Sequence, residues 1–310
     1  MHSTSGLKIV FFGTPEFAAY ILRRLVEQGE QVVGVVTTPD KPQGRGMKLK
    51  GSAVKEAAEQ YGIPVLTPAK HKDPQFINAL RGFNADVFVV VAYKILPKEV
   101  FEIPRLGAFN IHASLLPKYR GAAPINWAII RGERETGIST FLLQEKVDTG
   151  KMFLERAIPI GENETAGELH DRLMVLGAEL ALETLNGLAA GTLHPQAQPE
   201  ALATDAPKIF PKDCIINFDR PAKDVHNFVR GLSPYPGATT THDGLRLKIL
   251  RTRVANGEQR RLQPGEFDIQ RPSERIFVGT LDSPLEILEL QREGKRAMSA
   301  SEFVRGIQRV

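Results

Sequence analysis

Six apolar residues in succession, Val87–Ala92, leave few choices of architecture for this chain. A strand buried on one face alternates apolar and polar residues, whereas a strand buried on both faces is apolar throughout. Strands of the second kind occur in parallel sheets that carry helices on both sides, so the run predicts an α/β fold. A membrane-crossing helix needs about 20 apolar residues, and from the shortness of this run we expect no membrane span.

Strand and helix signals alternate along the first half of the chain. Leu7–Gly13 is an apolar run of strand length, and Pro15 then opens a helical pattern of apolar residues. We expect further strands at 32–38, 65–67, 85–92, 108–112, 138–144 and 152–160, and helices at 53–61, 74–81 and 165–188. This order predicts a doubly wound, mostly parallel sheet flanked by helices.

The C-terminal third has shorter elements. We expect helices at 222–230 and 301–307 around strands at 238–242, 245–254, 266–269, 275–280 and 285–291. Short strands separated by turns predict a small antiparallel barrel of the oligonucleotide-binding (OB-fold) type. Residues 192–211 are rich in proline and lack periodicity, which is typical of a linker. The predicted organisation is therefore an α/β domain at 1–190, a linker at 191–207 and a β domain at 208–310.

The charge of the chain is unevenly distributed. Residues 208–310 carry 18 Lys and Arg against 13 Asp and Glu, whereas the rest of the chain is nearly neutral. A basic module favours a polyanionic partner, although an excess of this size is also ordinary for a protein surface. Cys214 is the single cysteine and cannot form an internal disulfide. A reducing, cytoplasmic setting fits this composition best.

The strand expected at 108–112 carries two candidates for chemistry. Asn110 and His112 are two residues apart, so their side chains share a face, and open α/β sheets bind ligands beyond the carboxyl ends of their strands. Asn can hold a developing oxyanion and His can move a proton, which suits attack on a carbonyl carbon. Asp148, in a turn, could orient His112 and favour its charged form. Equally, the strand-end pair could bond to loop backbone and Asp148 could cap its own turn.

Other motifs narrow the chemistry. Gly13–Phe17 stands where a dinucleotide fingerprint would, but Pro15 interrupts it, which argues against an NAD enzyme. The chain has no HExxH metal motif and no GxSxG nucleophile elbow. Residues 39–50 combine Pro and Gly with several cations, among them Arg45. They predict a basic loop, which is either a solvated surface segment or a binder of phosphates.

Several segments together resemble one family. They are Phe12-Gly-Thr-Pro-Glu-Phe-Ala18, Thr38-Pro-Asp-Lys-Pro-Gln-Gly-Arg-Gly46, Asn110-Ile-His-Ala-Ser-Leu-Leu-Pro-Lys-Tyr-Arg-Gly-Ala-Ala-Pro124, Asp148-Thr-Gly150 and Gly294-Lys-Arg-Ala-Met-Ser-Ala300. The Asn-x-His segment with a later Asp-Thr-Gly resembles folate-dependent formyltransferases as a group. The early segment, the basic loop and the C-terminal module resemble, more narrowly, the family that formylates methionyl-tRNA.

This resemblance implies a function. The formyl donor would be 10-formyltetrahydrofolate, and the acceptor the amino group of methionyl initiator tRNA, giving N-formylmethionyl-tRNA for translation initiation. Asn110, His112 and Asp148 would be the catalytic residues, and Arg45 would engage the tRNA. The folate site would include Ser114, Leu115, Leu116 and Pro117. The C-terminal OB-fold-like domain would help to bind tRNA, and we expect a cytoplasmic monomer with no metal and no membrane partner.

Two other functions stay open at this point. A formyltransferase acting on a small amine, such as a purine precursor or an amino sugar, would use the same three residues, but the extra C-terminal domain argues against it. A non-catalytic RNA-binding protein with a decayed enzyme domain would have no need to keep Asn110, His112 and Asp148 together. Their presence in the sequence therefore argues against a binding protein.

Overall fold

Residues 4–43, 48–255 and 261–307 are described by a computed structural model of the chain. They form two compact units, each assembled from segments that are not contiguous in sequence. The N-terminal unit comprises Met1–Gly121, Gly137–Ile158 and His170–Asp205, and the C-terminal unit comprises Ala122–Thr136, Pro159–Leu169 and Ala206–Val310. Arg45, one of the predicted site residues, lies outside the described residues.

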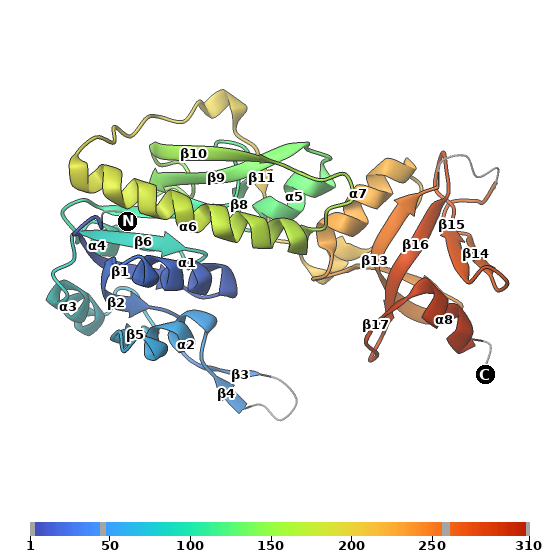
Figure 1. The fold of residues 1–310 in the computed structure, drawn as a ribbon, viewed down its shortest axis with the longest axis horizontal. Coiled ribbons are helices and arrows are strands. Elements are labelled where there is room, and N and C mark those ends of the chain that lie inside the picture. The colour runs from blue at the N-terminus through green and yellow to red at the C-terminus, as the bar shows by residue number, and fades with distance from the viewer. Residues whose placement is uncertain (1–3, 44–47, 256–260, 308–310) are drawn as a thin grey trace. The chain divides into compact units, whose positions relative to one another are not determined.

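A seven-stranded sheet forms the centre of the N-terminal unit, with the order β10-β9-β7-β6-β1-β2-β5 (Figure 1). The strands are β1 (Lys8–Gly13), β2 (Gln31–Val36), β5 (Val65–Leu66), β6 (Val87–Val91), β7 (Ala108–His112), β9 (Glu135–Leu142) and β10 (Met152–Pro159). Pairs from β5 to β7 are parallel, and β7 pairs antiparallel with β9. The order reverses between β1 and β6, which confirms the predicted doubly wound, mostly parallel sheet.

β6 lies in the middle of this sheet, and all five of its residues are buried. Aromatic side chains from β6 and its two neighbours are packed around it: Phe88 belongs to β6, Phe12 to β1 and Phe109 to β7, and all three are fully buried. The uninterrupted apolar run is thus the most deeply enclosed strand, as the sequence pattern predicts.

Helices flank the sheet: α1 (Glu16–Glu27), α2 (Ala53–Gln60), α3 (Pro74–Gly82), α4 (Lys98–Phe101) and α6 (Ala166–Ala190). Local capping fixes where two of them begin. The hydroxyl of Ser52 accepts the backbone N–H of Lys55 ahead of α2, and the carboxylate of Asp73 accepts that of Gln75 at the start of α3. Such caps satisfy backbone donors that the first helical turn leaves unpaired.

Of the described helices, α6 alone is long and apolar enough, by length and composition, to cross a membrane. Its Leu173, Leu180 and Leu185 are buried within the protein. A methyl group added at Gly177 would come within 3.2 Å of Ile21 in α1, so the helix packs closely there. Packing of one face of α6 against the core accounts for its apolar composition.

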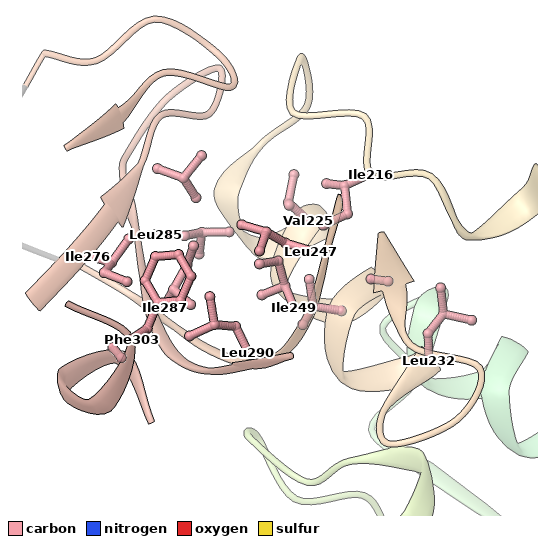
Figure 2. Close-up of a cluster of buried hydrophobic side chains, with 14 of the residues drawn as sticks. Ile216, Val225, Leu232, Leu247, Ile249, Ile276, Leu285, Ile287, Leu290 and Phe303 are labelled. Carbon is pink, nitrogen blue, oxygen red and sulfur yellow. The ribbon is translucent and has the colours of Figure 1, made fainter. Parts of the chain in front are cut away.

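The C-terminal unit contains an antiparallel sheet with the order β12-β13-β16-β15-β14, and β17 also pairs with β16. The elements are β12 (Ala238–His242), β13 (Leu245–Val254), β14 (Phe267–Gln270), β15 (Arg275–Val278), β16 (Leu285–Arg292), β17 (Ala297–Ser299), α5 (Pro124–Ile130), α7 (Ala222–Leu232) and α8 (Ala300–Ile307). This is the small β domain that the short strands predict. Its core brings Val225, Ile249, Ile287 and Phe303 together from α7, the sheet and α8 (Figure 2).

Some elements differ from the expectations. Residues 39–50, expected as a loop, include a short antiparallel pair, β3 (Lys41–Gln43) and β4 (Lys48–Lys50). The segment expected as a linker contains η1 (Glu200–Leu202) and β11 (Asp205–Ala206), and Gln196 pairs with Met152. These contacts use backbone groups, which every residue except proline can donate and accept. Composition therefore carries little signal for them.

A buried histidine makes the stability of the C-terminal unit depend on pH. In His226, Nδ1 lies 2.9 Å from Oγ1 of Thr252, and Nε2 lies 3.4 Å from the carbonyl oxygen of Glu162. Burial lowers the pKa of His226 from 6.5 to about 4, and the nearby Arg230 guanidinium acts in the same direction. Between these two values the unfolded chain binds a proton that the folded chain does not.

We predict that the free energy of unfolding falls as the pH decreases from 6.5 to about 4, by up to about 1.4 kcal/mol per pH unit. Urea unfolding at pH 7 and pH 5, followed by the fluorescence of Trp127, measures this, because Trp127 is the single tryptophan and lies in the same unit. His226→Gln should reduce the pH dependence, and His194→Gln, at an exposed site, should retain it. Equal dependence in the wild type and His226→Gln would contradict the prediction.

Candidate active site

Strand β7 presents Asn110 and His112 near the carboxyl edge of the parallel sheet. Asn110 is opposite Val90 of β6 and Phe141 of β9, so its position is fixed from both sides. The His112 residue is buried, while Asn110 is partly exposed. Among residues 4–43, 48–255 and 261–307, none hydrogen-bonds to the side-chain amide of Asn110. The amide is therefore available to a ligand.

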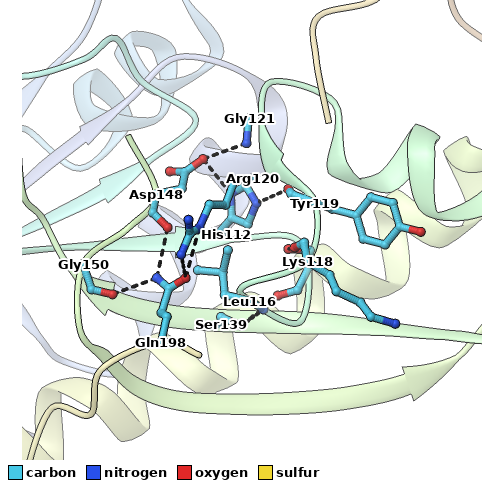
Figure 3. A network of polar contacts seen from close by, with 11 residues as sticks. His112, Leu116, Lys118, Tyr119, Arg120, Gly121, Ser139, Asp148, Gly150 and Gln198 are labelled. Atoms are coloured by element: carbon cyan, nitrogen blue, oxygen red, sulfur yellow. Dashed lines mark hydrogen bonds and ion pairs between the residues drawn. The ribbon is translucent and has the colours of Figure 1, made fainter. Parts of the chain in front are cut away.

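Two neighbours fix the orientation of the His112 ring (Figure 3). Its Nε2 lies 2.8 Å from the carbonyl oxygen of Tyr119. Since a carbonyl oxygen only accepts, Nε2 must carry a hydrogen. The other nitrogen, Nδ1, lies 3.9 Å from Oδ2 of Asp148. That distance suits an ion pair when the ring is protonated, and it makes Nδ1 the nitrogen whose proton can be exchanged.

Asp148 is held in a tight turn after β9. Its backbone has a φ of +52°, in the left-handed region. Its Oδ2 accepts the backbone N–H of Gly121 at 2.8 Å, and only 12% of its side chain is exposed. A methyl group added at Gly150 would lie 1.6 Å from the carbonyl oxygen of Leu142, so the turn requires glycine there. The carboxylate thus faces His112, which is one of the two arrangements that the sequence left open.

Three further side chains brace this turn, those of Gln198, Arg120 and Glu200, and no motif in the sequence predicts this role. The Nε2 group of Gln198 donates to the carbonyl oxygens of Asp148 and Gly150, at 3.0 and 2.7 Å (Figure 3). Its Oε1 accepts from Nε and Nη2 of Arg120, at 3.2 and 2.8 Å. The Arg120 guanidinium also forms a two-bond ion pair with Glu200 and lowers the pKa of that carboxyl group.

The residues predicted to contact folate form a turn that follows β7. The carbonyl oxygen of Ser114 accepts from Oγ of Ser139, and that same hydroxyl oxygen accepts the backbone N–H of Leu116. The Ser114, Leu116 and Pro117 residues are buried, while Leu115 is partly exposed. Any ligand contact from this turn would therefore involve Leu115 or backbone groups. Within the described part of the chain, no cluster of three His, Cys, Asp or Glu side chains could hold a metal ion.

The chain is similar to known proteins over almost its whole length. The formyl transferase family matches residues 7–185, and the formyl transferase C-terminal domain matches residues 208–308. The methionyl-tRNA formyltransferase of Citrifermentans bemidjiense is 48% identical over 97% of this chain and 94% of its own length. That of Bacteroides thetaiotaomicron is 44% identical over 97% and 95%.

Solved structures share the fold. HypX from Aquifex aeolicus in complex with tetrahydrofolic acid is 18% identical, with a TM-score of 0.67 over 96% of this chain and 47% of that protein. The N-formyltransferase from Helicobacter canadensis, in complex with folinic acid and dTDP-3-aminofucose, is 19% identical, with a TM-score of 0.66 over 92% and 99%.

The sheet, with Asn110, His112 and Asp148 at its edge, and both family matches define a formyl transferase. Within this class, the chain belongs to the methionyl-tRNA formyltransferase family, because relatives of that name match almost its whole length at 43–48% identity.

Proposed function

We propose that the protein transfers the formyl group of 10-formyltetrahydrofolate to the free amino group of methionyl initiator tRNA. The product is N-formylmethionyl-tRNA, which serves translation initiation. One observation carries the chemistry: Asp148 lies at ion-pair distance from His112. The strand that carries His112 also presents the amide of Asn110, to which no residue in the described part of the chain hydrogen-bonds. The full-length match to methionyl-tRNA formyltransferases supports the choice of acceptor.

In the proposed reaction the neutral amine attacks the formyl carbon, and the bond from that carbon to N10 breaks. The amide of Asn110 donates to the oxygen on which negative charge develops, since donors placed there stabilise a tetrahedral oxyanion. His112, when protonated at Nδ1, adds a second donor. The carboxylate of Asp148, 3.9 Å from Nδ1 of that ring, takes a proton from the amine and returns it to N10. Atoms and protons balance, so the chain ends the cycle unchanged.

The remaining roles divide by region. Ser114, Leu115, Leu116 and Pro117 border the folate, and Arg45 engages the tRNA. We keep the ranges 1–190, 191–207 and 208–310 as catalytic domain, linker and OB-fold-like tRNA-binding domain, an organisation supported by family matches that end at 185 and resume at 208. The excess of Lys and Arg in the last range supports a polyanionic partner. We further propose that the protein acts as a cytoplasmic monomer without a membrane partner.

A parallel formylation assay tests the function. Purified protein with 10-formyltetrahydrofolate is offered methionyl initiator tRNA, methionyl elongator tRNA and small amines, including an amino sugar. We expect formylation of the initiator tRNA in strong preference to the others. Transfer to a small amine instead would be consistent with the roles of Asn110, His112 and Asp148 but would contradict the proposed tRNA acceptor. Binding of tRNA without transfer to any acceptor would favour the RNA-binding alternative.

Replacing Asn110 with alanine tests the oxyanion role. We expect kcat to fall by about 10²–10³-fold, because one donor to the oxyanion is lost, while the fold and the KM for folate change little. Steady-state kinetics and thermal unfolding measure these quantities. Asn78→Ala, at an exposed position in α3, is the matched control and should be fully active. Near-normal turnover of Asn110→Ala would refute the role.

Replacing Arg45 with alanine tests the basic loop. Each cation lost from a phosphate contact weakens nucleic-acid binding and reduces its salt dependence. We therefore expect a lower kcat/KM for tRNA, a shallower dependence on salt concentration and unchanged folate binding. Arg81→Ala, which removes an exposed cation from α3, should leave all three unchanged. An unaltered kcat/KM for tRNA in Arg45→Ala would rule this contact out.

A further inference from the structure

The Gln198 side chain uses every hydrogen bond that an amide can make. Its two N–H groups point to the carbonyl oxygens of Asp148 and Gly150, and its oxygen accepts two N–H groups of Arg120. An amide has two donor hydrogens and two acceptor lone pairs, so no capacity is left over. A side chain bonded in this way is fixed in both position and orientation.

The orientation of the amide follows from its partners. A guanidinium only donates and a carbonyl oxygen only accepts, so the Gln198 oxygen must face Arg120 and its nitrogen must face the turn. Glu200 holds the Arg120 guanidinium through two further bonds, at 2.9 and 2.8 Å. Arg120 is 8% exposed, so this ion pair is shielded from water on the guanidinium side.

The backbone connects the same segments a second time. The Arg120 backbone N–H donates to the carbonyl oxygen of Thr204, and the N–H of Gly121, the next residue, donates to the Asp148 carboxylate. The segment 198–204 is therefore bonded both to the turn that carries Asp148 and to residues 120–121, which supply a donor to its carboxylate. Figure 3 shows the bonds made by Gln198 and Gly121. Asp148 itself has a left-handed backbone, which neighbours must hold in place.

We propose that Gln198 is a positioning residue for the formyl transfer, and that Arg120 sets its orientation. Gln198 holds the Asp148–Gly150 turn so that the carboxylate stays beside Nδ1 of His112. The role is assigned through Asp148 and not through substrate contact, since the Gln198 amide is fully bonded to protein groups. The inference rests on the proposed function, because it assigns Gln198 a part in that reaction through Asp148.

Two variants test the proposal. Gln198→Leu removes all four hydrogen bonds. Gln198→Glu keeps the oxygen that accepts from Arg120, but it replaces the donor NH2 group with an acceptor oxygen that faces two carbonyl oxygens. We expect both to lower kcat by about 10- to 100-fold, because small misplacements of a reacting group have effects of this size. The KM values for tRNA and folate should change by less than about threefold. Gln196→Leu, an exposed glutamine of the same segment whose described contacts with Met152 use its backbone, should behave as wild type.

A double-mutant cycle separates positioning from a general loss of structure. In an Asp148→Asn background, Gln198→Glu should lower single-turnover formylation by less than about twofold, because its effect acts through Asp148. An equal factor in both backgrounds, or a kcat within about twofold of wild type in folded Gln198→Glu, would overturn the inference. If Gln198→Leu does not fold, Gln198→Glu decides. A wild-type protein unable to formylate methionyl initiator tRNA would instead overturn the proposed function, so the two failures are distinguishable.

Discussion

The burial of β6 on both faces is the constraint from which the geometry of the site follows. Its parallel pairing with β1 and β7 sets the register, and Asn110 therefore lies beside Val90. That register brings the polar end of β7 to the carboxyl edge of the parallel strands, one strand away from the reversal of strand order between β1 and β6. Open α/β sheets bind ligands at this edge. Asn110 and His112 can move little, because their strand is paired with the closely packed strand β6. Precision at Asn110 and His112 thus originates in apolar packing.

The electrostatic interaction between His112 and Asp148 adds to the constraint that packing places on the site. The His112 ring and the Asp148 carboxylate are both largely shielded from water, and charges that face each other under such conditions interact more strongly than exposed ones. The backbone N–H of Gly121 satisfies an oxygen of the carboxylate and keeps it directed inward. The formyl transfer proposed above moves a proton, and this arrangement places the two groups proposed to handle it side by side.

The sequence predicted the parts of the molecule that depend on side-chain pattern. Periodic apolar residues marked the major strands and the long helix α6, and the spacing of Asn110 and His112 placed both side chains on one face. The bracing by Gln198 was not predictable in this way, because it joins residues about 50 positions apart through backbone carbonyl groups. Proline-rich composition indicated a linker there. The short helix α5 was also missed, since its apolar residues show no clear periodicity over seven positions.

The hydrogen bond from His112 to the backbone of residue 119 bears on mutational robustness. A side-chain acceptor at this point would be lost through a single base change, and with it the preference for a hydrogen on Nε2. A main-chain carbonyl is present whatever amino acid is encoded, provided that the turn keeps its course. The tautomer of the histidine is therefore buffered against substitution at position 119. Which residues are tolerated at position 119 would depend on whether they can adopt the left-handed backbone that Tyr119 has there, and not on the chemistry of its ring.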